Sequence, residues 1–297
     1  YGQSFASFNP PQQAVLALER LQKLQKPDGG FAAYPGAERS DPFVTPYAAE
    51  AIARANRAFT GGKLPAAASL VPTLTTYLQK TLADPGKYSY CKEALCKNQV
   101  RLQTLIALAA LDEPRNDFLA DLYAARNQFD PVDQIRLARY LSRFPDWQQE
   151  GKALTNQLQE SVYETGRLAK VTLPAGWGWL NSGTAAQAQT LQLVIEQKAK
   201  PEVIDRILQG LLAQRRNGTW QSTYDNAEAL DALVAYSRLQ PIPPDFEAIA
   251  QLAGKTLAST QFQGYQKPSS QTQIPLRDLP QGRNDLVLKK SGQGILH

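Results

Sequence analysis

Apolar residues recur every three or four positions through most of this chain, which is the spacing of one buried face of a helix. The stretch 98–111 shows this most clearly, because four apolar residues share one stripe there: Leu102, Leu105, Ile106 and Ala109. By the same criterion we predict ten helices in the first 240 residues, at 10–25, 45–57, 65–82, 98–111, 116–126, 131–144, 146–166, 185–197, 201–214 and 224–239.

A corner motif is repeated near the two ends of this helical region. Residues 25–31 are Gln-Lys-Pro-Asp-Gly-Gly-Phe, and residues 214–220 are Gln-Arg-Arg-Asn-Gly-Thr-Trp. In each copy a Gly accepts the positive φ that a tight turn needs, and an aromatic residue two positions later can anchor the turn. Ser222 or Thr223 can then cap the next helix. Weaker copies occur at 86–90 and at Gly176-Trp177-Gly178-Trp179.

Helix pairs that recur at intervals of roughly 40 to 60 residues are typical of a solenoid or a closed ring of helical hairpins. Every second predicted helix is rich in Ala, and in a ring one helix of each pair lines a narrow centre that admits small side chains. We therefore predict a mainly α fold, an alpha/alpha toroid of helical hairpins. Ten helices make five pairs, so a ring of six pairs would need two more helices.

The pattern changes after Pro241-Ile242-Pro243-Pro244. Residues 246–253 alternate, and Gly254-Lys255 can turn the chain into 256–262, but Phe246, Ile249 and Ala250 would also share a helix face. Periodicity alone leaves hairpin and helix open here. Residues 285–289 follow a turn and alternate as a strand does. We predict a toroid over residues 1–240 and a short β-rich segment over 241–297.

Composition and charge narrow the function classes. The chain of 297 residues is 43% hydrophobic and 20% charged, as a folded protein is, and its net charge of +5 comes from scattered basic residues. Scattered charges favour a solvated surface over a nucleic-acid site. The sequence contains no run of 18 apolar residues, so it predicts no membrane-spanning helix. The sequence contains no Met, so we expect it to be a piece of a longer protein.

The two cysteines, Cys91 and Cys96, are five positions apart. On a continuous helix their side chains would diverge too far to pair. If Cys91 lies in the turn before the helix they can form a disulfide, which would indicate an oxidising compartment. Two reduced, half-buried thiols fit the spacing equally well.

The sequence lacks the residues that several classes of helical-toroid enzyme need. A zinc prenyltransferase needs His, Cys and Asp ligands, and the only His is His297. The Asp-x-Asp-Asp and Asp-Asp-x-x-Asp clusters of terpene cyclases are absent. Asp117 and Asp121 lie four apart on a predicted helix, and Asp130 and Asp133 lie at a helix start, where capping explains them better than catalysis. We predict no metal, cofactor or catalytic residue.

Two further classes stay open at this point. A glycosidase or lyase needs only two carboxylates across a cleft, and Trp177, Trp179 and Trp220 could serve as sugar platforms, although each lies at a structural turn of the repeat. A binding module would dock a partner and catalyse nothing.

The order of the motifs resembles the thioester-containing, complement-like domain of the alpha-2-macroglobulin family, and more narrowly its bacterial branch. The resemblance covers essentially the whole chain. It rests on a corner motif shared with terpenoid cyclase-like toroids, followed in order by Ser222-Thr223-x-x-Asn226-Ala227, the proline-rich linker, a hairpin, Leu279-Pro280-x-Gly282-x-Asn284 and Gly292-x-Gly294. It implies that residues 241–297 begin a following β-sandwich domain of the macroglobulin type.

The resemblance also implies a function, that of a broad-spectrum protease inhibitor. In such proteins a protease cleaves a bait region, and a buried Cys–Gln thioester then acylates the protease. The implied partners are proteases and other domains of the same parent chain, and not nucleic acid or metal. The thioester motif Gly-Cys-x-Glu-Gln is absent, and we expect the chain to begin after it, where the ring is two helices short.

Two finer expectations follow from the resemblance. Some complement relatives direct the acyl group to hydroxyls with a His in the loop that corresponds to 86–97, and this loop has Tyr88, Tyr90 and Lys92 but no His. We therefore expect direct attack by Lys amines, with the two tyrosines as packing residues of the turn. The family also implies a periplasmic or cell-surface location, tethered to a membrane through another part of the protein, which fits a Cys91–Cys96 disulfide.

Overall fold

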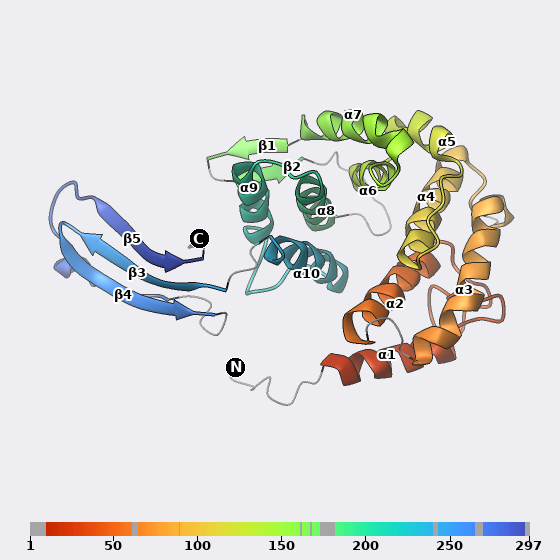
Figure 1. Ribbon diagram of the computed structural model, residues 1–297, viewed down its shortest axis with the longest axis horizontal. Helices are drawn as coiled ribbons and strands as arrows, with labels where there is room; N and C mark the ends of the chain where they lie inside the picture. The colour runs from red at the N-terminus through yellow and green to blue at the C-terminus, as the bar shows by residue number, and fades with distance from the viewer. Residues whose placement is uncertain are drawn as a thin grey trace. The chain divides into compact units, whose positions relative to one another are not determined.

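The structure is a computed structural model that describes residues 10–60, 65–88, 90–160, 162–166, 168–172, 182–239, 243–264 and 270–294. The chain divides into two compact units, Tyr1–Glu228 and Ala229–His297, with the division inside the last helix. The first unit is built from helices, and the main sheet belongs to the second (Figure 1).

The described residues contain ten α-helices, so the predicted mainly α fold is confirmed. Their bounds agree with the predicted ones to within a few residues in most cases. They are α1 Pro10–Leu24, α2 Val44–Thr60, α3 Pro65–Ala83, α4 Ala94–Ala110, α5 Leu119–Ala124, α6 Pro131–Leu141, α7 Gln148–Gln159, α8 Gly183–Glu196, α9 Pro201–Leu212 and α10 Thr223–Ser237.

Successive helices of the first unit alternate between two layers. In the inner layer α2 contacts α4, α4 contacts α6, and α6 contacts α8, while α1 packs on α3, α7 on α6 and α9 on α8. Figure 1 shows these helices following one another around an arc, with α2, α4, α6 and α8 on its inner side. Small buried side chains let the inner helices approach, as the Ala-rich pattern predicts; they include Ala49, Ala107, Ala138 and Ala186.

The apolar core lies between the two layers. Its largest fully buried side chains come from both outer and inner helices, and burying side chains of this size supplies most of the favourable free energy of folding. They include Leu70, Leu74 and Tyr77 of α3, Leu102, Leu105 and Leu108 of α4, and Ile135 and Tyr140 of α6.

Each copy of the corner motif leads into a capped helix. Asp41 Oδ1 accepts hydrogen bonds from the amides of Phe43 (2.8 Å) and Val44 (2.9 Å) at the start of α2. Ser222 Oγ accepts one from the amide of Asp225 (3.0 Å) at the start of α10. Side-chain oxygens at these positions satisfy amides that have no partner within the helix. The predicted cap at Ser222 is therefore confirmed.

Four residues after each cap, a polar side chain hydrogen-bonds to both the backbone amide and the backbone carbonyl of the corner's aromatic residue. Thr45 Oγ1 accepts from the amide of Phe31 (2.9 Å) and donates to its carbonyl (3.1 Å). Asn226 accepts from the amide of Trp220 (3.2 Å) and donates to its carbonyl (3.1 Å). Trp220 is only 7% exposed. The repeat is thus a repeated hydrogen-bond pattern as well as a repeated sequence.

The predicted helix at 146–166 is wrong after Gln159. α7 ends at Gln159, and a hairpin of β1 (Val162–Thr165) and β2 (Leu168–Val171) follows, with Gly166 in its turn at a φ of 59°. The hairpin packs on α9, where a Cβ at Gly210 would lie 2.1 Å from the Ala169 carbonyl oxygen. Tertiary packing against this glycine favours the strand over the helix that the periodicity predicts.

The second unit contains an antiparallel sheet in the order β4-β3-β5, formed by β3 (Asp245–Leu252), β4 (Lys255–Gln263) and β5 (Leu286–Gln293). Of the two alternatives after the proline-rich linker, the chain adopts the hairpin and not the helix. Ala253 and Gly254 form its turn, with φ values of 49° and 79°. α10 ends before, and β3 begins after, the predicted boundary at 240/241. The assignment of two domains there stays a prediction.

The first corner approaches α3 closely at Gly29. Its φ is 91°, and a Cβ would lie 2.2 Å from the Thr73 carbonyl oxygen, whereas Gly218 has a similar φ of 86° with no atom closer than 3.7 Å. We expect Gly218→Ala to cost about 1–2 kcal/mol through backbone strain. Gly29→Ala should cost at least about 2 kcal/mol more through overlap. Urea unfolding followed by circular dichroism measures both; equal costs would contradict the close approach.

Candidate functional site

The two cysteines lie in a turn beside the start of α4. The structure joins Cys91 and Cys96 in a disulfide with Cα atoms 5.3 Å apart. α4 begins at Ala94, so Cys91 lies in the turn before the helix, which is the arrangement under which pairing is expected. The bond therefore ties this turn to the first turn of α4.

The two tyrosines of this turn differ in their surroundings. Tyr88 is buried, and its hydroxyl contacts those of Tyr77 and Thr81, so it is a packing residue as predicted. Tyr90 is 60% exposed, and its hydroxyl donates to Asp41 Oδ2 at 3.2 Å. Because Asp41 caps α2, Tyr90 connects the disulfide turn to the neighbouring corner. Its ring also packs against that of Tyr88, with the ring centres 6.2 Å apart, so Tyr90 is a packing residue of the turn in part, as predicted.

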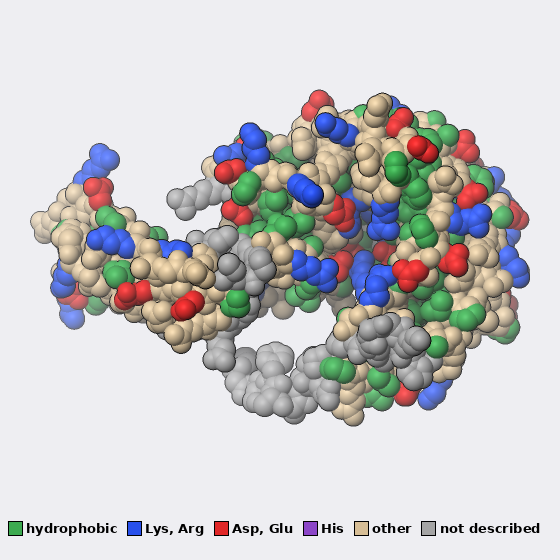
Figure 2. Space-filling model, viewed as in Figure 1, with side chains coloured by type: hydrophobic (Ala, Val, Ile, Leu, Met, Phe, Trp, Pro, Cys, Tyr) green, Lys and Arg blue, Asp and Glu red, His purple; other side chains and the backbone are tan. Residues whose placement is uncertain are grey.

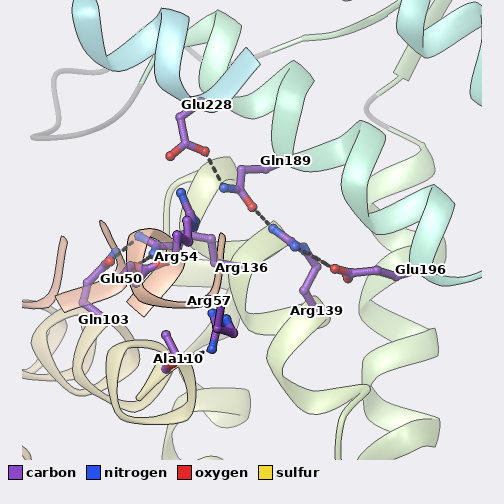
Figure 3. Close-up of polar contacts among 10 residues, drawn as sticks. All are labelled: Glu50, Arg54, Arg57, Gln103, Ala110, Arg136, Arg139, Gln189, Glu196 and Glu228. Carbon is purple, nitrogen blue, oxygen red and sulfur yellow. Dashed lines mark hydrogen bonds and ion pairs between the residues drawn. The ribbon is translucent and has the colours of Figure 1, made fainter. Parts of the chain in front are cut away.

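A polar cluster between the inner helices was not predicted from the sequence. It is centred on α6, whose Asp133, Arg136 and Arg139 are spaced three apart and so lie along one face. Figure 3 shows the partners of the two arginines, which come from α2, α4 and α8. Asp133 and Arg136 are buried. A charge at such a position is costly unless it is paired and hydrogen-bonded.

Arg136 joins three inner helices. Its guanidinium donates to Glu50 of α2 and to the Gln103 side-chain oxygen of α4, and the side chains of both members of the ion pair are only 9% exposed. Burial by itself would lower the pKa of Arg136, but the Glu50 carboxylate and the acidic groups around it raise it above its ordinary value. The guanidinium therefore stays charged, and it needs α2 and α4 in place.

Arg139 continues the cluster toward α8 and α10. It pairs with Glu196 through two hydrogen bonds, at 2.6 and 3.0 Å, and donates to the side-chain oxygen of Gln189. The amide nitrogen of Gln189 in turn donates to Glu228 at 2.5 Å. Burial raises the pKa of Glu228. One chain of hydrogen bonds therefore reaches from α6 through α8 to the start of α10 (Figure 3).

Asp133 corrects a prediction. Asp130 does cap α6, because it accepts from the amide of Asp133 at 3.0 Å. The Asp133 side chain, however, points into the cluster and accepts from Gln103 (2.8 Å) and Gln99 (3.1 Å). Burial, with the nearby Asp130 carboxylate, raises the pKa of Asp133 to about 7, while Arg136 and the two amides oppose this rise.

The side chains of the cluster connect helices to one another. The carboxylates of Glu50, Glu196 and Glu228 all accept hydrogen bonds from side chains of the same cluster, so no free pair of carboxylates faces an open space there. Within the ranges that the structure describes, no group of three or more His, Cys, Asp or Glu side chains could hold a metal ion. None of the described helices is both long enough and apolar enough to cross a membrane.

The residues considered for enzyme functions are not brought together. Asp117 is exposed and pairs with Arg115 at 2.8 Å, and Asp121 lies in the first turn of α5. The Trp220 ring is buried and its nitrogen donates to the Leu211 carbonyl at 3.0 Å, which leaves no platform for a sugar. Trp177, Trp179 and His297 lie outside the described residues. Figure 2 shows acidic and basic side chains scattered over the visible face.

Asp133 predicts a pH dependence of stability. Because its pKa is higher in the folded state than the ordinary value near 4, its contribution is greatest at low pH and is lost as the pH rises toward about 7. We expect the free energy of unfolding of Asp133→Asn, minus that of the unchanged protein, to rise by about 2–4 kcal/mol between about pH 4 and 8. Urea unfolding at several pH values measures this difference.

The matched control is Asp117→Asn, because hydrogen bonding to Arg115 lowers the pKa of Asp117 and its carboxylate is largely exposed. That variant should show no gain in relative stability over the same range. A constant difference between Asp133→Asn and the unchanged protein at every pH would show that Asp133 is ionised throughout.

Comparison with known proteins identifies the family. The sequence is 55% identical over 302 aligned residues to an alpha-2-macroglobulin homolog of Nostoc sp. (strain PCC 7120), with 100% of this chain aligned. The chain spans 15% of the length of that protein. No protein-family model matches the sequence.

Solved structures match the fold. Native Escherichia coli alpha-2-macroglobulin matches 84% of this chain and 15% of its own, with a TM-score of 0.59 and 19% identity. A crystal structure of the same native protein from domain MG7 to the C-terminus matches 86% of this chain and 38% of its own, with a TM-score of 0.60 and 18% identity. The form activated by porcine elastase gives a TM-score of 0.58 at 20% identity, over 83% of this chain and 21% of its own.

At these identities the structures show the fold alone, while the sequence match over the whole chain carries the relationship. The two agree on the same family, and both align this chain with one part of a much longer protein. The chain therefore belongs to the alpha-2-macroglobulin family.

Proposed function

We propose that this chain is part of a bacterial, broad-spectrum inhibitor that traps proteases, and that the chain itself catalyses no reaction. The observation that carries the proposal is the 55% identity over the whole chain to the Nostoc homolog. The E. coli structures add that a protein of this fold is activated by elastase and by trypsin. Proteases and other domains of the longer protein are the proposed partners.

In this proposal the helical unit is a rigid support for a thioester carried elsewhere in the longer protein. After a protease cleaves the bait region, a Lys amine of the protease would attack the Gln carbonyl carbon of the thioester. An amide bond would form, and the C–S bond would break and release the Cys thiolate. Support of this kind needs helices that keep their positions, which the capped corners and the Arg136 cluster provide.

The exposed apolar residues of the sheet in the second unit favour its being part of a larger β-sandwich. Leu286 and Leu288 of β5 are 60% and 65% exposed, and they are paired with Leu252 and Ala250 of β3. Paired residues share a face of the sheet, so the part of this face around Leu286 and Leu288 is apolar and exposed within the described part of this chain. We propose that further strands of the longer protein cover it, as in a macroglobulin-type domain.

The disulfide supports a periplasmic or cell-surface location, tethered to a membrane through another part of the protein, because disulfides persist in oxidising compartments. We expect alkylation of the natively exported protein, followed by non-reducing mass mapping, to find a peptide linked through Cys91 and Cys96. Two alkylated thiols in that preparation would contradict the proposed location.

Protease trapping is tested with the longer protein that contains this chain. We expect trypsin treatment to produce a covalent protease adduct that survives denaturing electrophoresis, and methylamine pretreatment to abolish the adduct while adding the mass of one amine. The amine reacts with the thioester before a protease Lys can. Trapping without an adduct and without a mass gain would contradict the thioester but keep the inhibitor. No inhibition of trypsin cleavage of a protein substrate would contradict the proposed function.

A further inference from the structure

A cavity of about 220 Å³ lies between the β1–β2 hairpin and the helices α7, α8 and α9. No residue of the Arg136 cluster or of the disulfide turn lines it, so it is a separate feature of the first unit. Folded proteins rarely leave voids much larger than a water molecule. An apolar cavity of roughly 150 Å³ can admit benzene, so this one has room for a molecule of one or two small rings.

The walls of the cavity are apolar. Five of the side chains that line it are at most 8% exposed: Leu158 of α7, Ala169 of β2, Leu193 and Val194 of α8, and Ile207 of α9. Val162 of β1 and Val203 of α9 are half-buried and extend the apolar surface. An apolar ligand in contact with these side chains is removed from water, which favours its binding.

The hydroxyl groups on the walls are already hydrogen-bonded within the fold. Thr155 donates to the Gly151 carbonyl at 2.8 Å, and Thr190 donates to the Ala186 carbonyl at 2.8 Å. Thr155 also accepts from Gln197 at 2.6 Å. A buried water molecule needs roughly two to four polar partners, and these walls offer few. Replacing poorly ordered water with an apolar group increases affinity.

Glu164 is the only charged residue among those that line the cavity. It pairs with Arg206 at 2.5 Å, and both side chains are about half exposed, so the pair lies at the surface. A charged ligand would lose its hydration in the cavity without meeting a free opposite charge among the described lining residues. The exposed Gln159 amide makes no hydrogen bond with a described residue, so it can bind one polar group of a ligand.

The buried side chain of Gln187 in α8 holds the hairpin in place. Its nitrogen donates to the carbonyls of Ala169 (2.7 Å) and Ile207 (2.9 Å), and its oxygen accepts from the amide of Val171 (2.9 Å). These bonds connect β2 to α8 and α9 and oppose a shift of the strand into the cavity. A site whose walls are fixed before binding loses less conformational entropy when a ligand arrives.

We propose that this cavity binds a small, uncharged and mainly apolar molecule of about the size of indole. The apolar body of the ligand contacts Leu193, Val194 and Ile207, and a single hydrogen-bonding group can reach Gln159. The apolar walls disfavour ions, and the volume is too small for drug-sized ligands, whose sites occupy roughly 300–1,000 Å³. The inference does not depend on protease trapping.

Fluorine NMR of fluoroindole mixed with the 297-residue chain tests the site. We expect saturable broadening of the ligand signal, which unlabelled indole reverses. A fluoroindole carboxylate should bind at least about tenfold more weakly, because its charge would lose hydration without gaining a partner. The variants Val203→Phe and Val162→Phe place a larger side chain in the cavity from α9 and from β1. Each should lower the affinity for fluoroindole at least about tenfold.

The control variant is Val71→Phe, which makes the same substitution at a half-buried position of α3 that does not line the cavity. Its affinity for fluoroindole should be unchanged, and circular dichroism confirms that each variant is folded. Absence of saturable binding would overturn the proposal, as would equal binding of the carboxylate or an equal loss in the control variant. Binding by the 297-residue chain but not by the longer protein that contains it would overturn it in favour of a contact with another domain.

Discussion

The inner helices depend on one buried ion pair. Arg136 of α6 places a positive charge between α2 and α4, where its partners are Glu50 and Gln103 and water has little access. Removing one partner of a buried pair costs about 3–5 kcal/mol when the other charge is left without compensation, and Arg54, which pairs with Glu50 at 3.3 Å, offsets part of that cost here. The positions of α2 and α4 relative to α6 are therefore fixed by a polar requirement that apolar packing of Ala and Leu side chains alone would not impose.

The corners and the cluster stabilise different parts of the first unit. At each corner, neutral hydrogen bonds with Thr45 or Asn226 fix the backbone of the aromatic residue to the following helix. In the centre, Arg136 and Arg139 connect inner helices to one another. Local bonds therefore set the geometry of each pair, and long-range ionic bonds set the spacing between pairs.

Much of this fold follows from the sequence, because helix periodicity, the corner glycines and the caps act over short distances. The hairpin after α7 does not, since its strands are stabilised by packing on α9 around Gly210. The cluster was missed for a similar reason. Asp133, Arg136 and Arg139 are ordinary surface residues by spacing alone, and only the fold brings Glu50 and Gln189 to them. A single Glu in the Ala-rich helix at 45–57 was a signal in the sequence, and so was Glu228 among the alanines of the helix at 224–239.

Arg136 holds the inner helices to α6, and amide hydrogen exchange of the Arg136→Met variant can test this. Loss of the guanidinium leaves Glu50 without its buried partner, so we predict faster exchange in α2 and α4 together, with α9 unchanged. The double variant Glu50→Gln/Arg136→Met should recover part of the protection. Unchanged exchange in α2 and α4, or an equal rise in every helix including α9, would contradict the claim.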